Sequence, residues 1–255
     1  TRPGRLHMGY SFELLVDDFS AGYIRGTVER LEAVMDGWPC WAISNHDVQR
    51  AVTRWGGPDA SPDFARQMVG LVCSLRGSVC LYQGEELGLP EADVPFEQLR
   101  DPYGTTSWPN FKGRDGCRTP MPWTGADDAG FSTGTPWLPI PDAHRQRSVA
   151  TQEADPHSVL ATTRHFLHWR RDQPALVAGA QQFIAAPDPV LAFVRGDAGS
   201  RLLAVFNLSA SPVAWPLPAH LGGAQATGGH GLVAGSIEAG MAHLPAHAAL
   251  FATLD

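Results

Sequence analysis

Apolar residues recur along the first 180 positions in two alternating patterns. Short apolar runs predict three strands, at residues 6–12, 41–44 and 78–82. Apolar residues at helical spacing predict three helices, at residues 19–36, 62–76 and 157–172, with Ser20 as the N-cap of the first. Strands that alternate with helices are typical of a parallel sheet, so the pattern predicts three β/α units of an α/β protein.

The pattern changes after Gly179. Alternating runs separated by Gly, Pro and Ser clusters, at residues 190–195, 202–208 and 247–253, predict a small antiparallel β-domain. We therefore expect a first domain over residues 1–176 and an all-β domain over residues 177–255. Within the first domain, residues 83–156 form a long segment rich in Pro, Gly, Asp and Trp. Loops longer than about 12–15 residues are uncommon unless they have a function, which makes this segment a candidate binding region.

Charge and composition narrow the function classes. The chain has 255 residues, 44% of them hydrophobic, and a formal net charge of −7. An acidic balance without a basic cluster argues against nucleic acid and against anionic membranes as partners. No apolar run is long enough to span a bilayer, and the first residues lack the apolar core of a signal peptide, so we expect a cytoplasmic location.

Cysteine spacing and loop composition predict no metal and no cofactor. The four cysteines show no CxxC pair, and buried free thiols are the better interpretation for three of them. The chain has no glycine-rich phosphate loop. Two histidines three residues apart, His165 and His168, lack an identifiable third ligand and are interpreted as surface residues.

Polar residues follow two of the predicted strands directly. Asn45, His46 and Asp47 come after the strand at 41–44, while Glu85 and Glu86 come after the strand at 78–82. Barrel enzymes place their chemistry at the carboxyl ends of parallel strands. Adjacent residues of a strand point to opposite faces, so Glu85 and Glu86 are predicted to be structural hydrogen-bonding groups and not a catalytic pair. For Asp47 the sequence leaves two roles open, a functional carboxylate or a cap for the turn.

Three motifs in register carry a resemblance to a known family. SNHDVQR (44–50), YQGEELG (82–88) and GRDGCRTPMPW (113–123) resemble the α-glucosidases of glycoside hydrolase family 13, in the bacterial α-glucosidase and oligo-glucosidase branch. The resemblance implies the C-terminal part of a (β/α)8 TIM barrel, its sixth to eighth units, followed by the small all-β domain of the family. One departure is Pro122, where many members carry Gln.

The resemblance also implies roles for individual residues. Asp47 matches the third catalytic carboxylate of the family, which grips hydroxyls of the reacting sugar. His46 matches a donor to the same sugar, and Arg114 matches an arginine that closes the non-reducing end of the pocket. Phe12 is a candidate for stacking on the aglycone sugar or, equally, a core residue. For Arg114 an ordinary ion pair with Asp115 or Asp101 stays open as the alternative.

These roles predict a retaining α-glucosidase that releases glucose from the non-reducing end of α-glucosides or oligosaccharides. In the family, the nucleophile and the acid/base follow the fourth and fifth strands, so both are expected upstream of Thr1. We therefore expect this chain to be inactive alone and to need the N-terminal part of the barrel as its partner. The alternatives are a glucosyl-transferring or sucrose-acting relative and a non-catalytic structural relative. The preference for α-1,4 or α-1,6 linkages stays open.

Overall fold

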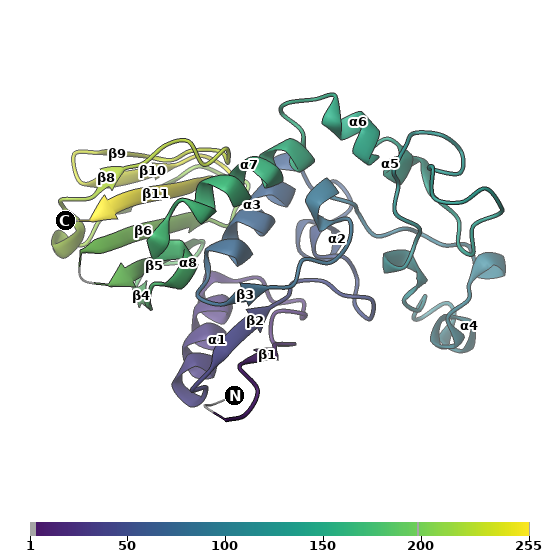
Figure 1. Ribbon diagram of the computed structural model, residues 1–255, viewed down its shortest axis with the longest axis horizontal. Helices are drawn as coiled ribbons and strands as arrows, with labels where there is room; N and C mark the ends of the chain where they lie inside the picture. The colour runs from purple at the N-terminus through teal and green to yellow at the C-terminus, as the bar shows by residue number, and fades with distance from the viewer. Residues whose placement is uncertain (1–3, 198, 255) are drawn as a thin grey trace. The chain divides into compact units, whose positions relative to one another are not determined.

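The computed structural model describes residues 4–197 and 199–254, which form two compact units (Figure 1). Unit 1 comprises the chain up to Ala42, residues Arg66–Cys80, and the chain from Thr163 onward. Unit 2 comprises Ile43–Ala65 and Leu81–Thr162. Helices α3 (Pro62–Ser74) and α7 (Val159–Arg171) contribute residues to both units. These units reflect compactness, and the domain boundary between residues 176 and 177 stays a prediction.

A parallel three-stranded sheet in unit 1 confirms the predicted parallel strands. Its order is β1 (Met8–Tyr10), β2 (Trp38–Trp41) and β3 (Ser78–Val79), and both pairings are parallel. Between β1 and β2 lies helix α1 (Ala21–Val34), and the Ser20 hydroxyl accepts a hydrogen bond from the backbone N–H of Tyr23, as expected for an N-cap. The strand predicted at residues 41–44 was misplaced, because β2 ends at Trp41.

The remaining strands of unit 1 form two antiparallel sheets. The five-stranded sheet has the order β4 (Gln181–Ile184), β5 (Val190–Asp197), β6 (Ser200–Asn207), β11 (Ala249–Leu254) and β8 (Gln225–Ala226). The three-stranded sheet has the order β7 (Val213–Pro216), β10 (Met241–Leu244) and β9 (Ser236–Glu238). Two short helices belong to the same unit, α8 (Pro174–Ala178) and η4 (Ala219–Leu221). The antiparallel pairing agrees with the alternating runs of the sequence.

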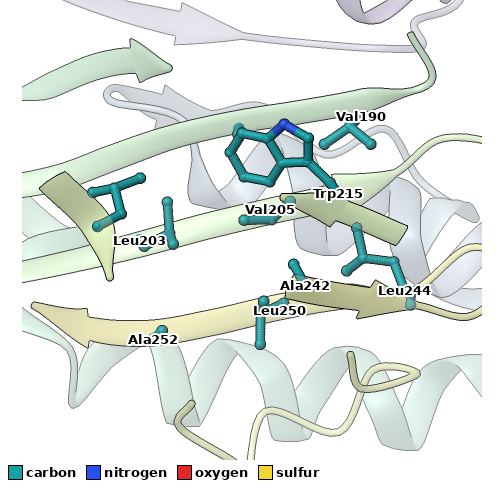
Figure 2. Close-up of a cluster of buried hydrophobic side chains, with 11 residues drawn as sticks. Val190, Leu203, Val205, Trp215, Ala242, Leu244, Leu250 and Ala252 are labelled. Carbon is teal, nitrogen blue, oxygen red and sulfur yellow. The ribbon is translucent and has the colours of Figure 1, made fainter. Parts of the chain in front are cut away.

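Both faces of the central strands are buried, and each face has its own packing. Leu203 and Val205 of β6 pack with Trp215 and Leu250 in a hydrophobic cluster that Figure 2 shows. On alternate positions Phe206 contacts the rings of Phe193 and Phe251, with centroids 6.0 and 5.8 Å away. Because side chains alternate between the faces of a strand, one strand supplies both clusters. Each fully buried Leu or Phe contributes roughly 1.5–3 kcal/mol, which anchors the sheet.

Apart from its residues of α3 and α7, the described part of unit 2 contains only short helices and turns. They are α2 (Ala51–Gly56), η1 (Glu85–Leu87), η2 (Phe96–Gln98), α4 (Pro102–Ser107), η3 (Asp115–Cys117), α5 (Asp142–Arg145) and α6 (Val149–Glu153). The long segment at 83–156 is therefore ordered, but with little regular structure.

Buried polar side chains hold this segment together through bonds to the backbone. The two ring nitrogens of the buried His144 lie 2.8 Å from the carbonyl oxygen of Pro90 and 3.2 Å from Oγ1 of Thr119. Gln152 donates to the carbonyl of Leu87 at 2.8 Å. Such bonds replace the ladders that a sheet would provide, because buried backbone groups must find partners.

Across the described residues, no helix combines the length and the hydropathy that crossing a bilayer requires. The cytoplasmic location stays a prediction.

Candidate functional site

The segment after β2 turns sharply, and its own side chains fix the turn. Oδ1 of Asn45 accepts the backbone N–H of Asp47 at 2.8 Å. Oγ of Ser44 accepts the backbone N–H of Ala51 at 2.8 Å, where α2 begins. Short polar side chains that bond to the backbone two residues on are typical of such turns. The turn leaves the Asp47 side chain 46% exposed and that of His46 68% exposed.

Two arginines converge on one oxygen of Asp47. Nη1 of Arg114 and Nη2 of Arg118 each lie 2.9 Å from Oδ1 of Asp47. Arg118 also donates through Nε to the carbonyl oxygen of His46 at 2.7 Å. The second oxygen of Asp47, Oδ2, lies 3.4 Å from Nε2 of His46. Asp47, His46 and Arg114, which the sequence predicts to work together, therefore lie in one cluster.

Arg118 belongs to this cluster although the sequence analysis did not single it out. It lies four residues after Arg114, at the other end of the short helix η3. The signal was present in the motif GRDGCRTPMPW, where two arginines flank a turn. A pair with this spacing can direct both guanidinium groups toward one acceptor only if the intervening turn folds back, and the sequence did not reveal that turn.

A second aspartate orients Arg114. Asp101 is buried and accepts Nε of Arg114 on Oδ2 at 2.8 Å and Nη2 on Oδ1 at 2.9 Å. It also accepts the backbone N–H of Arg114 at 2.8 Å. These hydrogen bonds hold the pKa of Asp101 well below its usual range and raise the pKa of Arg114. Both interpretations of Arg114 thus describe it in part, since one guanidinium forms the ion pair with Asp101 and also reaches Asp47.

Asp101 is itself held in place by Asp115. Oδ2 of the buried Asp115 accepts the backbone N–H groups of Arg100 and Asp101, at 2.6 and 2.8 Å. A bidentate arginine–carboxylate pair is geometrically specific, so this chain of bonds fixes the direction of the Arg114 side chain.

The two glutamates after the third predicted strand are structural, as expected, although they lie in helix η1 and not at a strand end. Glu85 is buried and accepts the backbone N–H of Tyr82 at 3.0 Å, and burial raises its pKa to about 7. Glu86 accepts the backbone N–H of Gly84 at 2.7 Å. Both carboxylates therefore serve the local backbone.

An open hollow of about 410 Å³ lies beside Arg118. Its lining combines aromatic and polar side chains: Gln83, Glu86, Arg118, Thr119, Pro120, Met121, Trp123, Phe131 and Trp137. The rings of Trp123, Phe131 and Trp137 are about half exposed. Apolar walls with a few polar groups are typical of small-molecule sites.

Phe12 belongs to unit 1, two residues after β1. Phe12 is 66% exposed in this structure, and its ring meets that of Tyr10 edge-on with centroids 4.9 Å apart. Its contact with a sugar stays a prediction.

The cysteine thiols of this chain are free. Cys40, Cys73 and Cys117 are buried and free, as predicted for three of the four cysteines, while Cys80 is free and exposed. In residues 4–197 and 199–254, no group of three or more His, Cys, Asp or Glu side chains is arranged to hold a metal ion.

Comparison with known proteins identifies the family to which this chain belongs. The profile of the α-amylase catalytic domain matches residues 10–179. The chain belongs to the α-amylase family. The α-amylase family includes the α-glucosidases of glycoside hydrolase family 13, so the resemblance carried by the three motifs is confirmed.

Several relatives of this α-amylase family chain have names that describe glucoside chemistry. A probable α-glucosidase of Rhizobium meliloti is 43% identical over 259 residues, which cover 98% of this chain and 45% of the relative. An oligo-1,6-glucosidase of Heyndrickxia coagulans is 30% identical over 202 residues, which cover 71% of this chain and 36% of the relative. The crystal structure of the α-glucosyl transfer enzyme XgtA is 58% identical, with a TM-score of 0.96, over 99% of this chain and 47% of that enzyme. The chain thus spans half or less of the length of these relatives.

Proposed function

We propose that this chain supplies the sugar-gripping side of a retaining α-glucosidase active site, with Asp47 as its central carboxylate. The observation that carries the proposal is the convergence of Arg114 and Arg118 on Oδ1 of Asp47, each at 2.9 Å. Two guanidinium groups that donate to one oxygen fix the plane of the carboxylate. The exposed remainder of Asp47 can accept hydrogen bonds from sugar hydroxyl groups, beside the more exposed His46.

In this role Asp47 contributes to catalysis by differential binding. Hydrogen bonds from ring hydroxyls to a fixed carboxylate strengthen as the sugar approaches an oxocarbenium-like transition state. His46 donates to the same sugar, and Arg114 closes the non-reducing end, so that single terminal glucose units are removed. The hollow beside Arg118 offers room for the group to which the glucose is bonded.

The two reacting carboxylates belong, in this proposal, to the part of the longer relatives that this chain does not span. Retention requires a nucleophile and an acid/base about 5–5.5 Å apart across the bond. The described cluster holds only one carboxylate that faces outward, Asp47. We therefore expect the 255-residue chain alone to be inactive on aryl α-glucosides, and robust turnover by the pure chain would contradict this.

Glucosyl transfer is the second candidate, and the 58% identity to the α-glucosyl transfer enzyme XgtA favours it. Hydrolysis and transfer share the glucosyl-enzyme step and differ in whether water or another hydroxyl accepts the sugar. Product analysis with maltose, isomaltose and sucrose separates the two, because only transfer produces larger glucosides, whereas hydrolysis releases both halves of the substrate as free sugars. A purely structural role is disfavoured by the ordered Asp47 cluster.

The decisive experiment replaces Asp47 in the full-length natural protein. Asp47→Asn keeps the shape of the side chain but removes the charge that the two arginines hold. We expect kcat on p-nitrophenyl α-glucoside to fall roughly hundredfold or more, as when other electrostatic groups of an active site are removed. Asp93→Asn is the control, because Asp93 is exposed and forms a salt bridge with Lys112, away from the Asp47 cluster. A kcat for Asp47→Asn equal to that of the control would refute the proposal.

A further inference from the structure

Arg50 is fully buried in unit 2, and its guanidinium binds backbone and not a carboxylate in the contacts described. Nη1 donates to the carbonyl of Gln83 at 2.7 Å, and Nη2 donates to the carbonyl of Cys117 at 3.1 Å. The guanidinium also lies 5.3 Å from the centre of the Tyr82 ring. A buried cation is costly unless its hydrogen bonds are well formed, so these contacts must be held firmly.

The carbonyl of Cys117 is the link to the candidate site. It belongs to the peptide group that joins Cys117 to Arg118, the residue whose guanidinium binds Asp47. Oη of Tyr82 donates to the same carbonyl at 3.0 Å. Two donors on one carbonyl fix the plane of that peptide and hence the direction in which the Arg118 side chain leaves the backbone.

The backbone of Arg50 belongs to the loop that carries Asp47. Arg50 follows Asp47 by three residues and directly precedes α2, and its backbone N–H donates to Oε2 of Glu91 at 2.8 Å. One residue therefore ties the loop that carries Asp47 to the turn that carries Arg118.

Glycine at position 84 makes room for this arrangement. Its backbone has φ +91°, and a Cβ placed there would lie 2.8 Å from Nη1 of Arg50. A side chain at this position would strain the backbone and would also collide with the Arg50 guanidinium.

We propose that Arg50 is a positioning residue that acts through Arg118 to hold Asp47 in its working orientation. Its effect on turnover rests on the proposed function, whereas its effect on the Arg118–Asp47 contact does not. The competing explanation is that Arg50 stabilises unit 2 and does nothing more.

Arg195 provides a matched control for that explanation. It is also fully buried, and it also binds backbone carbonyls, those of Ser74 at 2.6 Å and Gly179 at 3.0 Å. It belongs to unit 1 and makes no described contact with the Asp47 cluster. Arg195→Met should therefore reproduce the loss of a buried guanidinium without changing the site.

The experiment measures kcat and KM on p-nitrophenyl α-glucoside for variants of the full-length protein at a temperature where all are folded. We expect Arg50→Met to lower kcat/KM by roughly 10–100-fold, since small displacements of catalytic groups have effects of this size. Arg50→Lys should recover part of the loss, because lysine can bind one of the two carbonyls but not both. Arg195→Met should lower the melting temperature but leave kcat/KM within about twofold.

A double variant tests whether Arg50 acts through Arg118. If it does, Arg50→Met should add little to the loss in kcat/KM caused by Arg118→Met, since coupled residues have non-additive effects. Full additivity, or a loss for Arg50→Met no larger than for Arg195→Met, would overturn the proposal.

Crystal structures of the variants separate this inference from the proposed function. In Arg50→Met the distance from Nη2 of Arg118 to Oδ1 of Asp47 should exceed 3.5 Å, while in Arg195→Met it should stay near 2.9 Å. A wild-type protein without turnover would refute the proposed function, and the crystal structures would still decide the role of Arg50. An unchanged contact in Arg50→Met would refute the positioning role whatever the activity.

Discussion

His144→Gln should make the stability of the protein less sensitive to acid. His144 is fully buried, and burial lowers its pKa to about 4 from its ordinary value of 6.5. Its ring nitrogens lie within hydrogen-bonding distance of Pro90 and Thr119, so at neutral pH it is a neutral crosslink of the long segment. Glutamine offers a donor and an acceptor at similar reach, but it cannot take up a proton.

The sign and size of the effect follow from the two pKa values. Between about pH 6.5 and pH 4 the unfolded chain binds a proton at this residue that the folded chain does not, so stability falls as the pH is lowered. Over this range the loss from His144 alone reaches about 3 kcal/mol. Glu85 and Glu91, whose pKa values burial raises to about 7, act in the opposite sense, since their folded forms retain a proton up to higher pH.

Urea unfolding of wild type and His144→Gln at several pH values between 4 and 7 isolates the histidine, because the glutamates contribute equally to both proteins. We expect the difference in unfolding free energy to shift in favour of the variant by about 3 kcal/mol between pH 7 and pH 4. His157→Gln, at an exposed histidine of the same unit, should follow the wild type. If the unfolding free energies of wild type and His144→Gln changed in parallel with pH, His144 would not be a buried histidine that stays neutral in the folded protein.

Two further substitutions test other parts of unit 2. Gly116→Ala should destabilise the protein by about 1–3 kcal/mol, because a Cβ would lie 2.3 Å from Oε1 of Glu91 and 2.5 Å from the carbonyl oxygen of Ala92. A melting temperature equal to that of wild type would refute this close approach. Asp101→Asn should lower kcat/KM of the full-length protein roughly tenfold on aryl α-glucosides, because Arg114 loses the bidentate partner that directs it to Asp47. Unchanged kinetics would show that Arg118 alone is enough to orient Asp47.

The sequence predicted the regular elements best where local chemistry and burial agree. Ser20 followed by apolar residues at helical spacing predicted the cap and helix α1, because both signals are local. The strand at 41–44 was misplaced because apolarity reports burial and not pairing. Ala42 and Ile43 are buried but lie beyond β2, whose register with β3 ends at the pair of Trp41 and Val79. A ladder needs a partner strand, and the partner is encoded elsewhere in the chain.

The candidate site divides in a similar way. Asp47, His46 and Arg114 could be identified from motifs, since their residue types and spacing resemble a family. Asp101 was one of two aspartates that the sequence offered as an ion-pair partner of Arg114. Arg118 was not singled out, because the contacts cross an irregular segment in which no periodicity indicates which residues meet. Arg50 appears in the sequence only as the last residue of the motif SNHDVQR, and its burial depends on contacts with residues more than 30 positions away in the chain.

Because two arginines bind the same oxygen of Asp47, this carboxylate has two separate supports. Arg114 and Arg118 reach it by separate supports, one through Asp101 and the other through the backbone at Cys117. When a substitution weakens one arm, the other still binds Oδ1 of Asp47, so we expect each single change to lower activity only in part and the loss of both arms to lower it further. Mutant libraries that vary Arg114 or Arg118 alone will therefore underestimate how much the two arginines together contribute to activity. Randomising both positions at once is the way to find new orientations of Asp47.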